Sequence, residues 1–173
     1  MTAMMRGMVD DMLNQGLRNL PGHVQIHHPA FRDDPSVNNS LPPPKGSLLT
    51  ALQDPEVKAW SARVKVPGVI MSERESRGIQ LLGVDPAQAL TMSFDAASIT
   101  EGRFLDSGDD RGIVIGERLL ERLETRLGKR IVVMSQDPDN EVRDRGFRVV
   151  GVYRSQLRSQ EEIFAYVGRE TLQ

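Results

Sequence analysis

The apolar residues of this 173-residue chain come in short runs that end at glycine, proline or charged residues. Several runs alternate apolar and polar positions, a period that is typical of strands with one buried face. The run from Gly112 to Gly116 is apolar in its interior, as expected of a buried strand, and leads directly into a predicted helix. Short runs of this kind favour a sheet of short strands. The predicted strands cover residues 23–27, 63–71, 78–84, 112–116, 131–134, 147–153 and 163–167.

Helical periodicity predicts the other regular elements. Apolar residues, many of them methionine, recur at spacings of three and four within residues 2–20. Leucines on one face predict a helix from Glu117 to Leu127, which Gly128 ends in the left-handed conformation that glycine adopts at low cost. Short helices are also predicted with Ser47 as N-cap, from Asp54 with Pro55 in the first turn, and from Arg169. The chain is therefore predicted to be α+β, with mixed sheets and packed helices.

Two segments are predicted to lie outside regular structure. The stretch from Pro29 to Gly46 contains five prolines, which lack the backbone donor that a helix or a central strand needs, so it is an extended surface crossing. The polar stretch from Ser135 to Gly146 separates two predicted strands and is interpreted as a hairpin tip.

Composition excludes several classes of function. The formal net charge is −2, so no global positive field is available to hold nucleic acid. The chain has no cysteine, which removes disulfides, thiolate nucleophiles and cysteine metal sites. No apolar run approaches the roughly 18–20 residues that span a bilayer.

The side chains that carry chemistry form no convincing site. His23 and His27 are predicted on one face of a strand, about 13 Å apart, which is too far to share a zinc ion. The acidic run from Asp137 to Glu141 resembles a calcium loop but has Val142 where that loop needs glycine. We therefore predict no catalytic residues, no metal and no cofactor. A metal-dependent hydrolase that uses His23, His27 or His28 with Asp106 or Asp110 ranks third, after the two hypotheses given below.

The order of several short motifs is more specific than any motif alone. The motifs are Gly22–Ile26, Val64–Val69, Gly78–Pro86, Glu101–Leu105, Gly112–Gly116, Gly128–Val133 and Phe147–Tyr153. Over residues 17–173, this order resembles the MacB-like periplasmic core domain of ABC transporter permeases in the FtsX-like superfamily. The resemblance is closest to the lipoprotein-releasing permease branch.

This resemblance implies where the segment lies and which subunit hydrolyses ATP. The segment is expected on the periplasmic side of the inner membrane, between two membrane helices of a permease that forms a dimer. ATP hydrolysis is expected on a separate cytoplasmic ATPase subunit, so this segment is not an enzyme. It is expected to couple ATP-driven motion to lipoprotein release or substrate export, and to meet a periplasmic carrier, a lipoprotein or an efflux partner.

The resemblance also implies an internal organisation. A βαβ porter-like part is expected at residues 1–87 and 160–173, and a second, inserted α+β part at residues 88–159. Family domains continue beyond the position of Gln173, so the chain is expected to be a truncated piece. In the related branch a hairpin grips the carrier, and the counterpart here offers these residues as a possible partner-binding site: Asp137, Asp139, Glu141, Val142, Arg143 and Arg145.

A second hypothesis comes from a different functional class. The methionine-rich helix, with its stripe from Met4 to Leu17, is also suited to adaptable contacts between copies of a protein. The chain would then be a free-standing interaction module that dimerises through this helix.

Overall fold

The computed structural model describes residues 24–33, 39–92, 94, 96–137, 139, 141–155 and 157–172. The predicted helix at residues 2–20 and His23 lie outside these ranges. The strands are β1 (Arg63–Met71), β2 (Ser76–Val84), β3 (Ile99–Gly102), β4 (Gly112–Gly116), β5 (Arg130–Gln136), β6 (Val142–Tyr153) and β7 (Phe164–Gly168). The helices are η1 (Pro29–Arg32), α2 (Ser47–Leu52), α3 (Pro86–Met92), η3 (Ala96–Ser98), α4 (Glu117–Arg122), α5 (Arg158–Ile163) and α6 (Arg169–Leu172).

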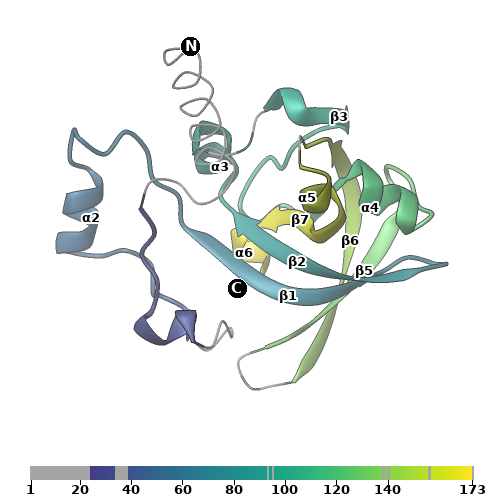
Figure 1. Ribbon diagram of the computed structural model, residues 1–173, viewed down its shortest axis with the longest axis horizontal. Helices are drawn as coiled ribbons and strands as arrows, with labels where there is room; N and C mark the ends of the chain where they lie inside the picture. Colours follow the sequence, from purple (N-terminus) through teal and green to yellow (C-terminus); the bar gives the residue numbers. More distant parts are fainter. Residues whose placement is uncertain are drawn as a thin grey trace, which may run out of the picture.

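The described strands form one mixed sheet that closes on itself. Its order is β3-β6-β4-β7-β2-β1-β5, and β5 also pairs with β6. The long strand β6 makes this closure possible, because its first half pairs with β5 and its last residues pair with β3 and β4. The result is a small barrel with short helices around it, which confirms the predicted α+β class (Figure 1).

The predicted hairpin between β1 and β2 is confirmed. The two strands pair antiparallel along their whole length, from Arg63 opposite Val84 to Met71 opposite Ser76. Ser72 forms the turn, because its hydroxyl oxygen accepts hydrogen bonds from the backbone N–H groups of Arg74 and Glu75. The same hydroxyl lies 2.6 Å from the carbonyl oxygen of Leu123 and donates to it, which ties the turn to the segment after α4.

Both faces of the central strands are buried. Inside the barrel, Ile113 and Ile115 of β4 pack with Ala165 and Val167 of β7 and with residues of β1, β2, β5 and β6. On the other face, Val114 and Tyr166 belong to a second apolar cluster under α3 and the segment that follows it. Burial on both faces explains why β4 is an uninterrupted apolar run in the sequence.

Aromatic rings dominate the outer cluster. Phe94 stacks on Phe104 with ring centroids 4.3 Å apart, and it meets the edges of Tyr166 and Tyr153 at 5.0 and 5.9 Å. Offset-stacked and edge-to-face contacts of this kind are favourable beyond the area they bury. They attach Phe94 to the sheet.

The helix after β4 is shorter than predicted. It ends at Arg122, and the N–H groups of Glu124 and Thr125 donate to the carbonyl oxygens of Glu121 and Leu120. This pair of hydrogen bonds is a Schellman motif, with Glu124 at φ 46° in the left-handed position. The predicted cap at Gly128 is therefore wrong. Gly128 does have a positive φ of 82°, but it lies in the turn that leads into β5.

Several predictions for the N-terminal part are also wrong. Residues 24–28 form no strand, and Asp54 begins a turn in which its carboxylate accepts from the N–H of Glu56, so no second helix forms. Helix α2 is present, but its N-cap is Gly46 rather than Ser47. The proline-rich crossing includes the single turn η1. The sequence interpretation also missed α3, β3 and α5.

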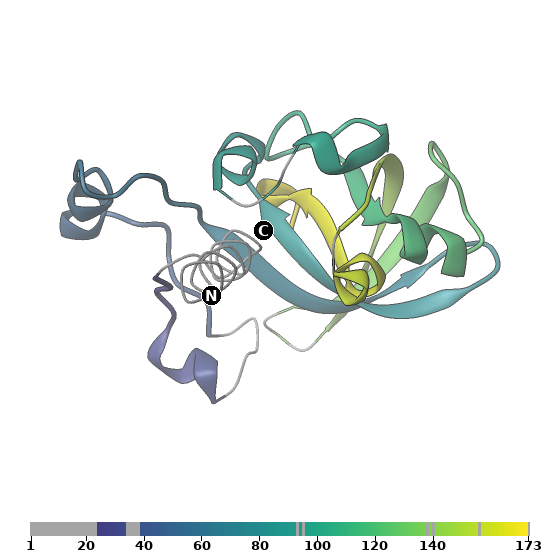
Figure 2. The same ribbon diagram turned by 45° about the horizontal axis from the view of Figure 1, so that its top comes forward.

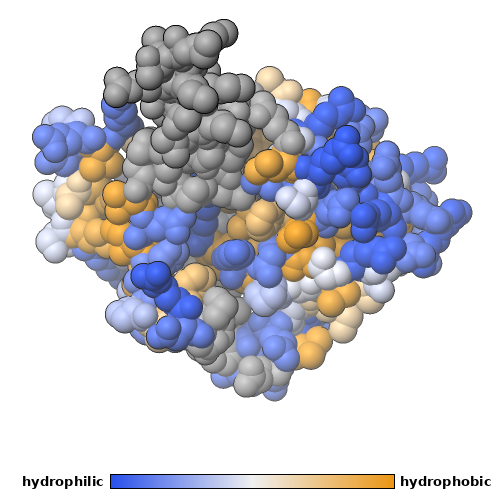
Figure 3. Space-filling model, in the orientation of Figure 1, coloured by the Kyte–Doolittle hydropathy of each residue, from blue (hydrophilic) through white to orange (hydrophobic). Residues whose placement is uncertain are grey.

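The segment from residue 24 to residue 62, which we call the N-terminal arm, lies to one side of the barrel (Figure 2). Hydrophobic surface gathers over α2 (Figure 3). No helix formed by the described residues is both long and apolar enough to cross a bilayer.

Candidate functional site

The tip of the β5–β6 hairpin, residues 137–143, is held by one aspartate. The carboxylate of Asp137 accepts hydrogen bonds from the N–H groups of Asp139 and Glu141 at 2.9 and 3.0 Å. Its second oxygen accepts from Arg143 Nε at 3.0 Å, and Arg143 also donates to the carboxylate of Glu141 at 3.0 Å. The described residues of the tip are therefore held together by a network of charged side chains.

The charge of Asp137 is stabilised by these donors. Desolvation raises the pKa of this carboxyl, but the hydrogen bonds from Arg143 and from the backbone outweigh it and hold the pKa below its usual value. Val142 begins β6 beside this network and is 60% exposed. Among the described residues of the tip, Val142 is thus an exposed apolar side chain beside a network of charged groups.

The structure brings five of the six predicted partner-binding residues to the tip and separates the sixth. The strands extend further than predicted, so the loop between them is shorter than residues 135–146. Arg145 consequently lies along β6, opposite Val133 of β5. It lines a hollow at the base of the hairpin rather than the tip.

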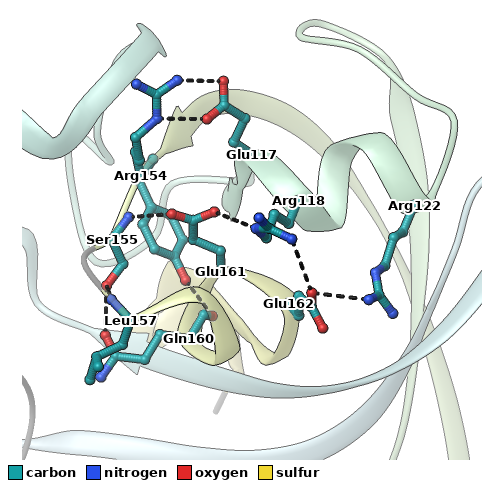
Figure 4. Close-up of polar contacts among 10 residues, drawn as sticks. Glu117, Arg118, Arg122, Arg154, Ser155, Leu157, Gln160, Glu161 and Glu162 are labelled. Atoms are coloured by element: carbon teal, nitrogen blue, oxygen red, sulfur yellow. Dashed lines mark hydrogen bonds and ion pairs between the residues drawn. The ribbon is translucent and has the colours of Figure 1, made fainter.

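A second polar site connects α4, α5 and the end of β6 (Figure 4). The guanidinium of Arg154 donates to both oxygens of Glu117 at 2.7 and 2.9 Å. The hydrogen bond from Arg154 is the main cause that lowers the pKa of Glu117, and Glu117 in turn raises the pKa of Arg154. This bidentate pair joins the first residue of α4 to the residue after β6.

Glu161 is the buried carboxylate of this site, with only 4% of its surface exposed. It accepts from the N–H of Ser155 at 2.7 Å and lies 3.8 Å from Arg118. The backbone of Glu161 also packs against Gly116, where an added Cβ would meet its carbonyl oxygen. Glycine at the end of β4 is therefore required for the close approach of α5.

Neighbouring residues extend the same network. Glu162 lies between Arg118 and Arg122, at 3.8 and 3.0 Å. The hydroxyl of Tyr153 donates to the carbonyl oxygens of Gln160 and Phe164, and burial raises the pKa of this tyrosine. The sequence interpretation missed this site because its residues come from separate elements. The sequence did offer a signal for this site: two arginines four apart in α4 and two consecutive glutamates in α5.

The groups proposed for metal-dependent hydrolysis have other partners. Asp110 accepts from Arg103 at 2.8 Å, and His27 bonds to Gln25 at 2.8 Å. His28 Nδ1 accepts from the N–H of Ala30, and Asp106 pairs with Arg103. Among the described residues, no group of three or more histidine, aspartate or glutamate side chains could hold a metal ion.

The comparisons with known proteins point to one family. The family model described as "MacB-like periplasmic core domain" matches residues 1–172. Among solved structures, the chain is similar to the extracellular domain of the noncanonic ABC-type transporter YknZ from Gram-positive bacteria. The TM-score is 0.51 at 20% identity, over 72% of this chain and 62% of that one.

A second similar structure is a domain of a putative permease protein from Porphyromonas gingivalis, with a TM-score of 0.47 at 18% identity. That similarity covers 70% of this chain and 51% of the other. The chain thus spans less than two thirds of either structure. No curated protein matches the chain.

Proposed function

The chain belongs to the family of MacB-like periplasmic core domains, and we propose that it is the extracytoplasmic part of an ABC transporter permease in the inner membrane. The family match over nearly the whole chain is the observation that carries this proposal. The barrel's similarity to the YknZ extracellular domain supports the fold on which it depends.

The proposed role is coupling rather than catalysis. ATP would be hydrolysed by a separate cytoplasmic subunit, and the motion would reach this domain through the membrane segments of a permease dimer. The domain would convert that motion into the release of a lipoprotein or the export of a substrate.

The strand pairing offers a direct path for such motion. The N-terminal arm leads into β1, and the end of β1 pairs with β5 from Gly68 opposite Ser135 to Met71 opposite Val132. The strand β5 continues into the hairpin with β6. A displacement of the arm would therefore reach the hairpin through the backbone hydrogen bonds of these two ladders.

The internal division is also a proposal. The strands β2 and β7 are parallel neighbours in the sheet, although they are far apart in the sequence. The chain between them contains α3, η3, α4, α5 and four strands. This arrangement supports residues 1–87 and 160–173 as a porter-like part and residues 88–159 as an insertion.

We further assign the contact with a carrier, lipoprotein or efflux partner to the hairpin tip. The tip lies at the end of the longest strand described, and Asp137 already holds the N–H groups of Asp139 and Glu141 without a partner. Preorganised loops lose less conformational entropy on binding. Val142 would supply the apolar contact, with Arg143 and Glu141 at its edge.

A cysteine-labelling experiment tests the location. These 173 residues contain no cysteine, so Val142→Cys introduces a single thiol into this segment at an exposed position. In intact spheroplasts that carry the full-length protein with this change, and with any cysteine outside the segment replaced by serine, a membrane-impermeant maleimide should label it. Labelling only after the cells are lysed would place the segment in the cytoplasm and contradict the proposal.

Val133→Cys is the matched control on the same hairpin, because Val133 is buried. It should react only after denaturation, which shows that labelling at position 142 reports location rather than unfolding. Purification of the same full-length protein in detergent tests the partner: an ABC ATPase subunit should accompany it. A preparation without any ATPase would exclude the proposed transporter complex.

A further inference from the structure

Four arginines surround two adjoining hollows at the base of the β5–β6 hairpin. The larger hollow has a volume of about 330 Å³ and is lined by Arg111, Arg145 and Asp109, among others. The smaller has a volume of about 220 Å³ and is lined by Arg111, Arg130 and Arg148. Gly146 and Phe147 line both, so the two hollows share one floor.

These arginines differ from most others in the described part of the chain. Arg74, Arg103 and Arg154, for example, each pair with a carboxylate. Among the described residues, none of the four arginines at the hollows forms an ion pair. The guanidinium of Arg148 donates to the carbonyl oxygen of Gly128 at 3.2 Å, which positions it without neutralising it.

The strand register places two of these arginines side by side. Arg130 lies directly opposite Arg148 in the β5–β6 ladder. Their charged groups point apart, because the Arg148 guanidinium reaches Gly128 and the Arg130 guanidinium lies over Gly146. The pair therefore extends positive charge along the base of the hairpin.

The floor of the hollows is shaped by a glycine. A Cβ added to Gly146 would lie 2.6 Å from two nitrogen atoms of the Arg130 guanidinium. The guanidinium therefore lies directly over the backbone of Gly146. Because the obstructed group is the end of a flexible side chain, Gly146→Ala would displace Arg130 without forcing the backbone to move.

We propose that the two hollows form one binding site for a phosphate-bearing anion. The planar fork of arginine matches phosphate oxygens in a bidentate geometry. Among the described residues that line the hollows, four are arginines and one is acidic, Asp109 of the larger hollow, whose carboxylate already accepts from Ser107 Oγ at 2.5 Å. This excess of positive charge suits a multiply charged group.

The same chemistry would accept a free phosphate compound or the headgroup of an anionic lipid. The site does not depend on the transporter role.

Binding to the full 173-residue chain tests this site at low ionic strength. Inorganic pyrophosphate, followed by titration calorimetry, represents the free ligand. Vesicles of phosphatidylglycerol and phosphatidylcholine, compared with phosphatidylcholine alone in a sedimentation assay, represent the lipid headgroup. The double variant Arg130→Gln/Arg148→Gln should weaken whichever interaction occurs at least about tenfold, since two charge-assisted contacts are lost.

Two further variants separate the site from general charge. Gly146→Ala should weaken binding while every arginine remains, whereas Arg74→Gln removes a positive charge at the β1–β2 turn and should leave binding unchanged. Circular dichroism checks that each variant is folded. Binding of pyrophosphate indicates a free phosphate ligand, and binding of the anionic vesicles alone indicates a lipid headgroup. The proposal is overturned if neither probe binds, or if Arg74→Gln weakens binding as much as the double variant.

Discussion

The barrel and the N-terminal arm are built by different means. The barrel buries residues on both faces of its central strands, and its fully buried side chains include Ile70, Ile113 and Leu119. No described residue of the arm is buried, and Val24 and Ile26 are 82% and 55% exposed. The arm lies beside the barrel rather than within its core (Figure 2).

Hydrogen bonding shows the same difference. In the arm, His28 caps η1 and Asp54 closes a turn, both through contacts two residues along the chain. At the end of the arm a described residue does bond to a distant one, where the N–H of Ala62 donates to the side chain of Gln88 at 3.3 Å. In the barrel, Ser72 bonds to Leu123 and Tyr153 to Phe164, so distant segments hold one another. The barrel is therefore expected to unfold as a cooperative unit, while the arm contributes little to its stability.

The largest expected difference comes from apolar truncation in the two regions. Ile113→Ala removes a fully buried side chain and should lower the free energy of unfolding by about 2–5 kcal/mol. Ile26→Ala is the matched change in the arm and should stay within about 0.5 kcal/mol of wild type. Urea unfolding of both variants makes the comparison. Equal losses would mean that the arm belongs to the cooperative unit.

Asp110 tests whether polar contacts also hold the barrel together. Desolvation raises the pKa of its carboxyl, but hydrogen bonds from Arg103, Asp106 and Gly112 outweigh it and keep the pKa below the unfolded value. The stability this provides is fully present above the unfolded-state pKa and is lost as the pH falls through the folded-state pKa. Asp110→Asn should cost about 1.5–3 kcal/mol at neutral pH.

The pH profile of that variant is the decisive measurement. Acidification should destabilise wild type more than Asp110→Asn, so the two free energies of unfolding should converge at low pH. Asp109→Asn, one residue away, should retain the wild-type profile. If the free energies of unfolding of wild type and Asp110→Asn differed by the same amount at every pH, the ionised carboxylate of Asp110 would not be the cause of the difference.

Glu161 tests the junction between α4 and α5. Glu161→Gln keeps an oxygen to accept from Ser155 but removes the charge that faces Arg118, so we expect a loss of about 1 kcal/mol in chemical denaturation. Glu162→Gln changes the more exposed neighbour and should cost less. If Glu162→Gln lowered the free energy of unfolding more than Glu161→Gln, the burial of Glu161 would not explain its contribution to stability.

The hairpin tip should resemble the arm in its small effect on stability, although barrel strands carry it. Arg143→Gln breaks the pairs with Asp137 and Glu141, and exposed ion pairs contribute at most about 1 kcal/mol. Thermal unfolding should therefore change little. A large drop in melting temperature would show that the tip is part of the cooperative barrel.

Local signals in the sequence predicted the strands of the barrel well. The alternation within β1 and the apolar run of β4 predict these strands because each signal lies within one element. The start of α3 had a signal that was overlooked: the side chain of Asp85 accepts from the N–H groups of Ala87 and Gln88, and Pro86 is the first helical residue.

The closure of the barrel could not be predicted from signals that lie within one element. It depends on parallel pairing between β2 and β7 and between β4 and β6, in which each strand meets a partner far along the chain. The site around Glu161 depends on the same long-range pairing, because β4, β6 and α5 supply its parts. The hairpin tip was located from the sequence. The position of Arg145 outside the tip was not, because it depends on the register between β5 and β6, which the alternation of apolar residues does not determine.

The double pairing of β1 also determines how the domain responds to mechanical load. A force applied along β1 would run across the hydrogen bonds that join it to β2 and β5. The ladders would then be loaded in shear, so many hydrogen bonds must fail together instead of opening one after another. A pull along this strand would therefore meet more resistance than a pull that separates the strands one hydrogen bond at a time.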